Sequence, residues 1–237
     1  MPTVAGLWAD LVDLVLPAAC AGCRAERVPL RYGFCPSCAG TLQQTRPRSV
    51  RPDPAPPGLP PCFALGPYAG VLREALLSYK ERGRHGLARP LGGLLAEVVA
   101  TAVGTPRPLL LIPVPATAQA VRARHGDHLR RLCGYAAGRL ACSGWPVAVA
   151  RPLRALPRAD STTLDQAGRA AAALAAFRPR PGRLSALARA GHGRTVVLLD
   201  DIVTTGATLS AVTGVLAAAG SRVDIAAVLA ATERRRP

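Results

Sequence analysis

Two adjacent acidic residues, Asp200 and Asp201, stand between an apolar run and a short loop rich in hydroxyl side chains. The apolar run, Val196 to Leu199, predicts a buried strand, and the residues after Gly206 predict a helix. Backbone amides at the start of such a helix can bind one phosphate, and carboxylates at a strand end can accept hydrogen bonds from ribose hydroxyls. The candidate ribose phosphate ligands are Asp200, Asp201, Thr204, Thr205, Gly206, Ala207 and Thr208, with the two acids as candidate catalytic residues.

An ordinary strand followed by a helix with a threonine N-cap is the alternative explanation of this segment. It does not account for two neighbouring carboxylates with no adjacent lysine to pair them. Gly206 is accounted for only by the phosphate-binding explanation, because a residue without a Cβ lets the backbone approach a phosphate closely.

Four cysteines have metal-ligand spacing: Cys20 and Cys23 form one C-x₂-C pair, and Cys35 and Cys38 form another, with eleven residues between the two pairs. Two such turns supply four thiolates to a tetrahedral Zn²⁺ and leave no open coordination position, so the predicted site is structural. Two disulfides or an iron–sulfur site would use the same residues. The other three cysteines, Cys62, Cys133 and Cys142, are interpreted as buried or incidental small residues.

The cysteine count and the N-terminus favour the cytoplasm. Seven cysteines leave an odd thiol in any disulfide scheme, and the first residues lack the basic start of a secretory signal. The early apolar stretch is interrupted by Asp10 and Asp13, and its periodicity predicts an amphipathic helix that packs on its own protein. No membrane span is expected.

The chain is strongly basic, with a net charge of +16, of which residues 62–237 carry +14 from 24 basic and ten acidic residues. This excess favours a phosphorylated or polyanionic partner. Only one of the 30 basic residues is a lysine, Lys80, so a preference for arginine codons explains part of the same excess.

Three sections follow one another along the chain. Residues 1–45 hold the amphipathic helix and the cysteine pairs, and residues 46–61 are so rich in proline that they predict a semi-rigid linker. In residues 62–237 strands alternate with helices, which predicts an α/β domain with a mostly parallel sheet covered on both faces. The expected strands are 63–68, 109–114, 147–150, 196–199 and 223–230. The expected helices are 71–79, 87–103, 118–140 (with a candidate break near Gly126) and 207–219.

The segment VVLLDDIVTTGAT resembles the phosphoribosyl pyrophosphate signature of type I phosphoribosyltransferases. The resemblance implies transfer of ribose 5-phosphate from phosphoribosyl pyrophosphate, with Mg²⁺ bound to that substrate. It also implies a pyrophosphate loop after an earlier strand, here Ile112–Thr117, with Pro113, Val114 and Pro115 as its candidate residues together with Lys80.

The whole chain resembles the ComF family, in which a four-cysteine ribbon, a Tyr…Lys…Gly segment, an IPVP strand end and the phosphoribosyl signature occur in this order. Those features correspond here to the four cysteines, Tyr68, Lys80, Gly83, the Pro113–Pro115 segment and the Asp200–Thr208 segment. The resemblance implies a competence-associated protein that handles incoming single-stranded DNA.

The chain departs from that family at the segment after IPVP, which reads Arg124-His-Gly-Asp-His128 in place of Arg-Gly-Phe-Asn-Gln. His125 and His128 are interpreted as exposed polar residues beside several arginines, although histidines at this spacing also suit metal or acid–base chemistry. Two functions remain: DNA handling with a phosphoribosyl pocket, and an active phosphoribosyltransferase in nucleotide salvage. A purely structural zinc-ribbon adaptor leaves Asp200 and Asp201 unexplained.

Overall fold

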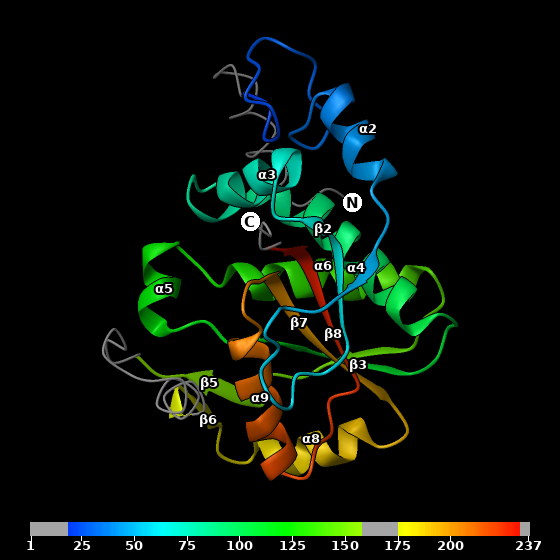
Figure 1. Ribbon diagram of the computed structural model, residues 1–237, viewed down its shortest axis with the longest axis vertical. Helices are drawn as coiled ribbons and strands as arrows, with labels where there is room; N and C mark the ends of the chain where they lie inside the picture. The colour runs from blue at the N-terminus through cyan, green and yellow to red at the C-terminus, as the bar shows by residue number, and fades with distance from the viewer. Residues whose placement is uncertain (1–18, 158–174, 233–237) are drawn as a thin grey trace, which may run out of the picture.

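The computed structural model describes residues 19–157 and 175–232. Its centre is a six-stranded sheet in the order β1-β2-β8-β7-β3-β4 (Figure 1). Neighbouring strands pair in parallel, except β1, which is antiparallel to β2 at the edge. The strands are β1 (Arg48–Val50), β2 (Cys62–Pro67), β3 (Leu109–Pro113), β4 (Val147–Val149), β7 (Thr195–Val203) and β8 (Ile225–Ala231).

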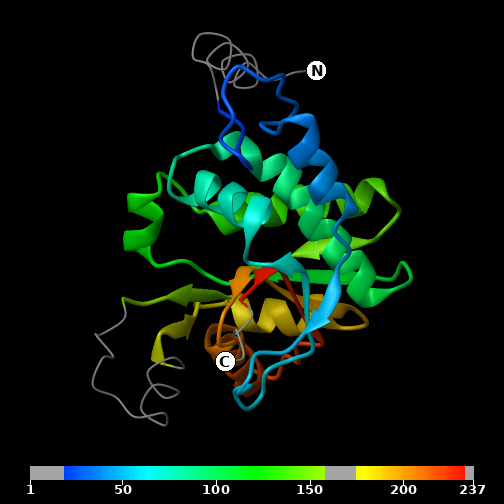
Figure 2. The same ribbon diagram turned by 45° about the horizontal axis from the view of Figure 1, so that its top comes forward.

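Helices cover both faces of the sheet, which lies between two helical layers in Figure 2. On one face α4 and α6 pack against each other and against the strands; α9 and α8 lie on the opposite face. The helices are α2 (Pro36–Gln44), α3 (Gly70–Lys80), α4 (Ala88–Val103), α5 (Ala118–Ala123), α6 (His128–Cys142), α8 (Arg183–Gly191) and α9 (Ala207–Ala218), and the 3-10 turn η1 (His85–Leu87) leads into α4. The predicted α/β fold class with a mostly parallel sheet is therefore confirmed.

The apolar strands form the core because both of their faces are covered. Every residue of β3 is buried, as are Val196–Leu199 of β7 and Ala226–Ala231 of β8. Continuous apolar runs of this kind are what a parallel sheet between two helical layers requires. A small antiparallel pair, β5 (Leu153–Ala155) with β6 (Phe177–Pro179), stands apart from the main sheet.

The helix predicted over 118–140, with its candidate break near Gly126, is divided into α5 and α6 at His125 and Gly126, whose positive φ angles of 51° and 143° end the first helix. Other elements differ from the sequence prediction. Within the predicted linker, Arg48–Val50 forms the edge strand β1, and the elements β5, β6 and α8 were not predicted. The strand predicted to end at Leu199 continues to Val203, with Asp200 paired opposite Val228 and Ile202 opposite Ala230. The two acids therefore lie inside β7, near its carboxyl end, and do not follow it.

One described stretch, His85–Val103, is long and apolar enough by length and composition to cross a membrane. In the fold it includes α4, whose residues Leu91, Leu95 and Val99 are fully buried. Because α4 packs against α6 and β8, it is a core helix of the α/β layer. The amphipathic helix expected in the apolar stretch that contains Asp10 and Asp13 lies outside the described residues, as does the basic tail after Thr232.

Candidate functional site

The carboxyl ends of β3 and β7 bring two separate sequence segments together. Pro113 pairs opposite Leu199, and the Val114 amide donates to the Leu199 carbonyl at 2.9 Å. The start of the Pro113–Pro115 segment thus lies beside Asp200, at the edge where parallel α/β sheets bind their ligands. The two segments that the sequence analysis assigned to one pocket are neighbours in the fold.

The loop between β7 and α9 makes a tight turn at Gly206, which has a φ of 75° and a ψ of 0° and is the N-cap of α9. This left-handed conformation favours glycine. Thr204, Thr205 and Ala207 are exposed, so the loop presents its backbone and hydroxyls to solvent. The Ala207 amide lies 3.4 Å from Thr205 Oγ1, a long contact that an anion would readily replace.

Asp201 is buried, with 7% of its surface exposed, and its carboxylate is held by two side chains from helices on one face. Lys80 Nζ at the end of α3 lies 2.7 Å from Asp201 Oδ2, and His128 Nε2 at the start of α6 lies 2.8 Å from the same oxygen. Burial alone raises the pKa of Asp201, but the His128 hydrogen bond and the Lys80 charge outweigh it and lower the pKa to about 2. Because an ionised carboxylate only accepts hydrogen bonds, the His128 ring nitrogen is the donor.

Asp200 has different surroundings because successive side chains of a strand point to opposite faces of the sheet. Asp201 faces the layer of α3 and α6, so Asp200 faces the layer of α9, where the loop of Gly206 begins. Asp200 is half-buried, and its Oδ1 accepts a hydrogen bond from the Asp201 amide at 2.9 Å. The two adjacent carboxylates therefore belong to two different environments.

His128 is a residue of this site that the sequence analysis missed. It was interpreted as exposed, but it is 7% exposed and bonded to Asp201, and Tyr79 Oη donates to its carbonyl at 2.7 Å. His125 lies in the turn before α6 and not on one helix with His128, so the two histidines do not form the i, i+3 helical pair that the alternative metal or acid–base interpretation requires. The one local signal was Asp127, which caps α6 through the Arg130 amide at 2.9 Å and so places His128 in its first turn.

The proline-rich linker lies against the loop of Gly206, a contact that no sequence pattern indicated. A Cβ at Gly206 would stand 3.1 Å from both Leu59 methyl carbons and 3.3 Å from Pro52 Cγ. Ser210 Oγ, one turn into α9, donates to the Pro57 carbonyl at 2.6 Å. A side chain at position 206 would therefore collide with Leu59 and Pro52 of the linker. The sequence alone suggested a different reason for the glycine, namely that a side chain would keep a phosphate away from the backbone.

Replacing Gly206 with Val is expected to weaken binding of ribose 5-phosphate at least tenfold. The substitution forces a branched residue into a positive φ, which costs about 1–2 kcal/mol, and pushes Leu59 and Pro52 away from the loop. Calorimetry with ribose 5-phosphate measures the effect. The control is Gly220→Val, since Gly220 also has a positive φ (76°) but lies after the far end of α9 with no atom within 4 Å of its Cβ position. Equal affinity of Gly206→Val and the unchanged protein would remove this loop from the site.

The four cysteines of the N-terminal segment converge as the spacing predicts. Their Sγ atoms all lie within 4.8 Å of one another, and those of Cys23 and Cys35 are 3.8 Å apart. Four thiolates about 2.3 Å from a tetrahedral Zn²⁺ stand about 3.8 Å apart, so the cluster has the dimensions of such a site. None of the seven cysteines is in a disulfide; Cys62 and Cys133 are buried, as expected, and Cys142 is exposed.

The electrostatics of the cluster also suit a cation. Burial raises the pKa of the Cys20 thiol, but hydrogen bonds from the amides of Cys35, Cys23 and Gly22 outweigh it and lower the pKa to about 6. Burial and the neighbouring sulfurs raise the pKa of Cys38. Several thiolates so close together repel one another, and a bound metal ion would remove this repulsion by neutralising their negative charge.

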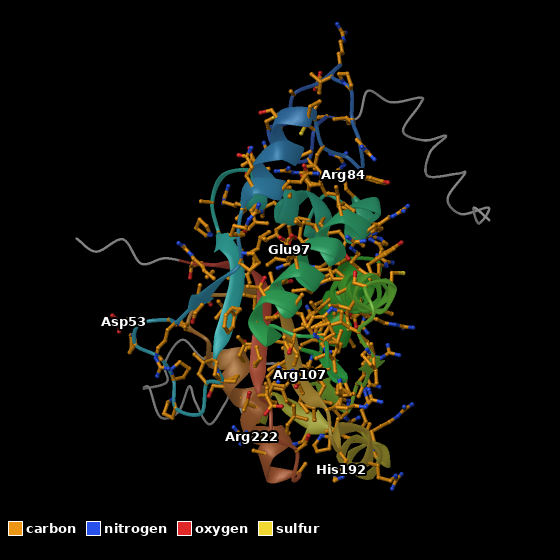
Figure 3. The ribbon with its side chains drawn as sticks, turned by 90° about the vertical axis from the view of Figure 1, so that its right-hand side faces the viewer. Asp53, Arg84, Glu97, Arg107, His192 and Arg222 are labelled. Carbon is orange, nitrogen blue, oxygen red and sulfur yellow. The ribbon has the colours of Figure 1, made fainter. Side chains whose placement is uncertain are left out.

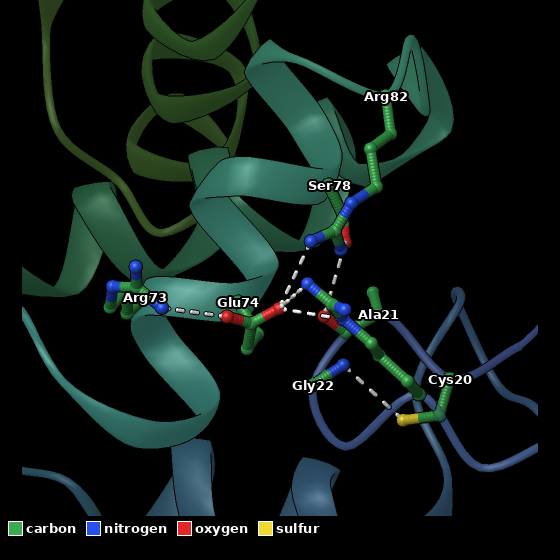
Figure 4. Close-up of polar contacts among 8 residues, drawn as sticks. Cys20, Ala21, Gly22, Arg73, Glu74, Ser78 and Arg82 are labelled. Atoms are coloured by element: carbon green, nitrogen blue, oxygen red, sulfur yellow. Dashed lines mark hydrogen bonds and ion pairs between the residues drawn. The ribbon is translucent and has the colours of Figure 1, made fainter.

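Polar contacts fasten this cysteine segment to α3 (Figure 4). Glu74 Oε2 of α3 lies 2.8 Å from Arg24 Nη2, and Ser78 Oγ donates to the Ala21 carbonyl at 3.3 Å. Arg82, just after α3, also pairs with Glu74 Oε2 at 3.2 Å. The same helix carries Lys80 at its end. The cysteine segment thus supports the helix that supplies one of the two partners of Asp201.

The comparison with known families locates a match at the C-terminal part of the chain. Residues 161–237 match the family described as the phosphoribosyl transferase domain, a range that contains β7, its two acids, the loop of Gly206, α9 and β8. No curated protein matches the sequence. Together with the parallel sheet and the strand-end acids described above, the match supports a phosphoribosyltransferase domain in this chain, preceded by a four-cysteine cluster that can hold a metal ion.

Proposed function

We propose that the edge formed by β3, β7 and the loop of Gly206 binds phosphoribosyl pyrophosphate, with Mg²⁺, or ribose 5-phosphate. The observation that supports this most is the position of Asp200, which faces the layer of α9 where the exposed loop starts. The loop residues Thr204–Thr208 bind the 5-phosphate through their amides and hydroxyls, and Asp200 accepts hydrogen bonds from the ribose hydroxyls. Asp201 holds the end of β7 in place through Lys80 and His128.

The segment Pro113–Pro115 is proposed to face the pyrophosphate of this ligand, because it lies beside Asp200 at the end of β3. In a transfer reaction, the bond between ribose C1 and the pyrophosphate oxygen breaks and a bond from C1 to the acceptor forms. The electron pair of the broken bond leaves with pyrophosphate. Bound Mg²⁺ would neutralise part of that developing charge, and the protein would chiefly position the sugar.

Titration with phosphoribosyl pyrophosphate in the presence and absence of Mg²⁺ tests this assignment. We expect saturable binding at one site per chain that Mg²⁺ strengthens, and we expect ribose 5-phosphate to compete for that site. An assay for pyrophosphate release with mixed nucleobases then decides between a binding protein and an active phosphoribosyltransferase in nucleotide salvage. The intact signature is the feature that favours the active enzyme. Failure of both sugar phosphates to bind would contradict the proposal.

We further propose a ComF-like cytoplasmic role in which the basic chain handles single-stranded DNA during uptake. The +14 charge of residues 62–237 supports a polyanionic partner. Among the described residues, Tyr32 is 54% exposed, and the guanidinium carbons of Arg31 and Arg89 lie 5.6 and 5.2 Å from its ring centre. Two arginines held over one aromatic ring by cation–π contacts concentrate positive charge that suits a phosphate.

Single-stranded DNA is expected to bind weakly, with an affinity that falls steeply with salt. Few aromatic residues are present, so contacts between arginines and phosphates dominate, and each such contact releases a counterion. Fluorescence anisotropy with a labelled oligonucleotide at 50 and 200 mM salt measures the slope, with a neutral-backbone oligonucleotide of the same sequence as the control. An affinity independent of salt would argue against the DNA-handling role while leaving the sugar phosphate site untouched.

A further inference from the structure

A groove of about 580 Å³ lies between η1, the start of α4 and the outer side of α6, on residues that the proposed phosphoribosyl site does not use. Its lining residues are His85, Ala88, Arg131, Gly134 and Tyr135. The volume is in the range of about 300–1,000 Å³ that small-molecule sites occupy. Arg131 follows His128 by one helical turn, so the groove adjoins the partners of Asp201 without including them.

Two nitrogen atoms of the groove residues have no hydrogen-bond partner among the described residues: Arg131 Nη1 and His85 Nδ1, both buried. Arg131 is otherwise oriented by one contact, in which its Nη2 donates to the His125 carbonyl at 3.1 Å. Burial, then the charge of Arg131, lowers the pKa of His85, so its ring is neutral at pH 7. Buried polar nitrogens without partners are unfavourable, so a shift of these two side chains toward an anion in the groove would give each nitrogen a partner.

The remaining lining residues add a flat apolar surface next to these nitrogens. Tyr135 is 49% exposed, and its Cβ packs against α4 at Gly92, where an added Cβ would stand only 2.5 Å away. Gly134 and Ala88 are small and leave the floor of the groove open. None of the five lining residues is acidic, and no ion pair of Arg131 occurs among the described residues.

We propose that this groove binds one nucleotide unit, with its phosphate on Arg131 and His85 and its base stacked on Tyr135. A guanidinium matches a phosphate in charge and hydrogen-bond donors, and a neutral imidazole adds one N–H donor. A half-exposed tyrosine ring accepts any base by stacking. A free nucleotide and a single strand of nucleic acid share this chemistry. The site is separate from the proposed phosphoribosyl site, so each can fail without the other.

The sharpest test adds a carboxylate to the floor of the groove with Gly134→Asp. Gly134 lies in α6 with no atom within 4 Å of its Cβ position, so the new side chain fits without displacing a neighbour and repels a phosphate on Arg131. Gly138→Asp is the matched control, because Gly138 is exposed on the same helix, also has an unobstructed Cβ position and lies outside the groove. Tyr135→Ala is a second variant that keeps the Cβ packed against Gly92.

Binding of AMP and of a labelled oligo(dT) to the full chain is measured at low salt by fluorescence anisotropy or calorimetry. Excess ribose 5-phosphate is present throughout these measurements, so that the proposed phosphoribosyl site is occupied and does not bind AMP. Gly134→Asp is expected to weaken binding about tenfold or more, Tyr135→Ala about tenfold, and Gly138→Asp less than threefold. Binding of AMP identifies a free nucleotide as a ligand, whereas binding of the oligonucleotide alone identifies nucleic acid. Phosphoribosyl pyrophosphate titrations should be the same in all three variants.

A second charge control lies far from the groove. Arg107→Gln removes one positive charge from the loop before β3, and Figure 3 shows Arg107 well separated from Arg84, the neighbour of His85. Arg131→Gln removes the same charge from the groove and should weaken binding about tenfold, while Arg107→Gln should change it little. The proposal is overturned if neither ligand binds, or if the groove variants and their controls lose affinity equally.

Discussion

Asparagine at position 201 is expected to destabilise the folded protein, whereas asparagine at position 200 is expected to weaken ligand binding without loss of stability. Asp201→Asn leaves Lys80 facing a neutral amide in an environment where the two side chains are only 13% and 10% exposed. Removing one partner of a buried ion pair costs about 3–5 kcal/mol. Asp200 faces the proposed ribose, and a lost hydrogen bond to a charged group reduces affinity about tenfold or more.

Thermal or urea unfolding of the two variants, together with calorimetry using phosphoribosyl pyrophosphate, separates the two effects. The control for Asp201 is the double variant Asp201→Asn with Lys80→Met, which removes both charges of the pair and should recover part of the lost stability. If Asp201→Asn folds with unchanged stability but loses the ligand, then Asp201 contacts the ribose directly, as the sequence analysis first suggested.

The pH dependence of stability provides an independent check on Asp201. Its folded-state pKa is lowered to about 2, below the ordinary value of 3.8, so its contribution to stability is complete above about pH 5 and is lost as the pH falls toward 2. The difference in free energy of unfolding between the unchanged protein and Asp201→Asn should therefore shrink over this range. A difference that stays constant down to pH 2 would mean that folding does not shift the pKa of Asp201.

Zinc removal is expected to have the largest effect on the N-terminal segment. We propose one Zn²⁺ per chain, held by Cys20, Cys23, Cys35 and Cys38, whose Sγ atoms all lie within 4.8 Å. Structural zinc sites of this kind contribute about 10–16 kcal/mol to the folding of small peptides. The combined change Cys35→Ser and Cys38→Ser should abolish zinc binding and make residues 19–45 sensitive to protease.

Elemental analysis of protein purified without added metal measures the zinc, and limited proteolysis reports the state of the segment. Cys142→Ser is the control, because Cys142 is exposed and lies at the end of α6, outside the cluster. Zinc far below one equivalent, or zinc retained by the double serine variant, would count against this metal site. Since the cysteine segment contacts α3 through Glu74, we also expect weaker phosphoribosyl pyrophosphate binding after zinc removal.

The features that the sequence determined by itself are local ones. Two C-x₂-C turns bring four thiols together within one short segment, and the apolar runs of β3, β7 and β8 predict a covered parallel sheet because helices alternate with them. The acids and the hydroxyl loop adjoin one another in the chain, so their convergence at one end of β7 also needed no long-range information. The fold class and the four-cysteine cluster were predictable for this reason.

The roles of individual charged groups were decided only by the tertiary structure. His128 and Asp201 are 73 positions apart, and only the docking of α6 on the sheet brings their side chains within 2.8 Å. The two acids separate because β7 extends past Leu199, and alternation along a strand turns Asp200 and Asp201 to opposite faces. The linker reaches Gly206 through side-chain packing of Leu59 and Pro52, which proline content alone does not specify. The periodicity of apolar residues shows which face of a helix or strand is buried. It does not show which charged residue from a distant part of the chain will pack against that face.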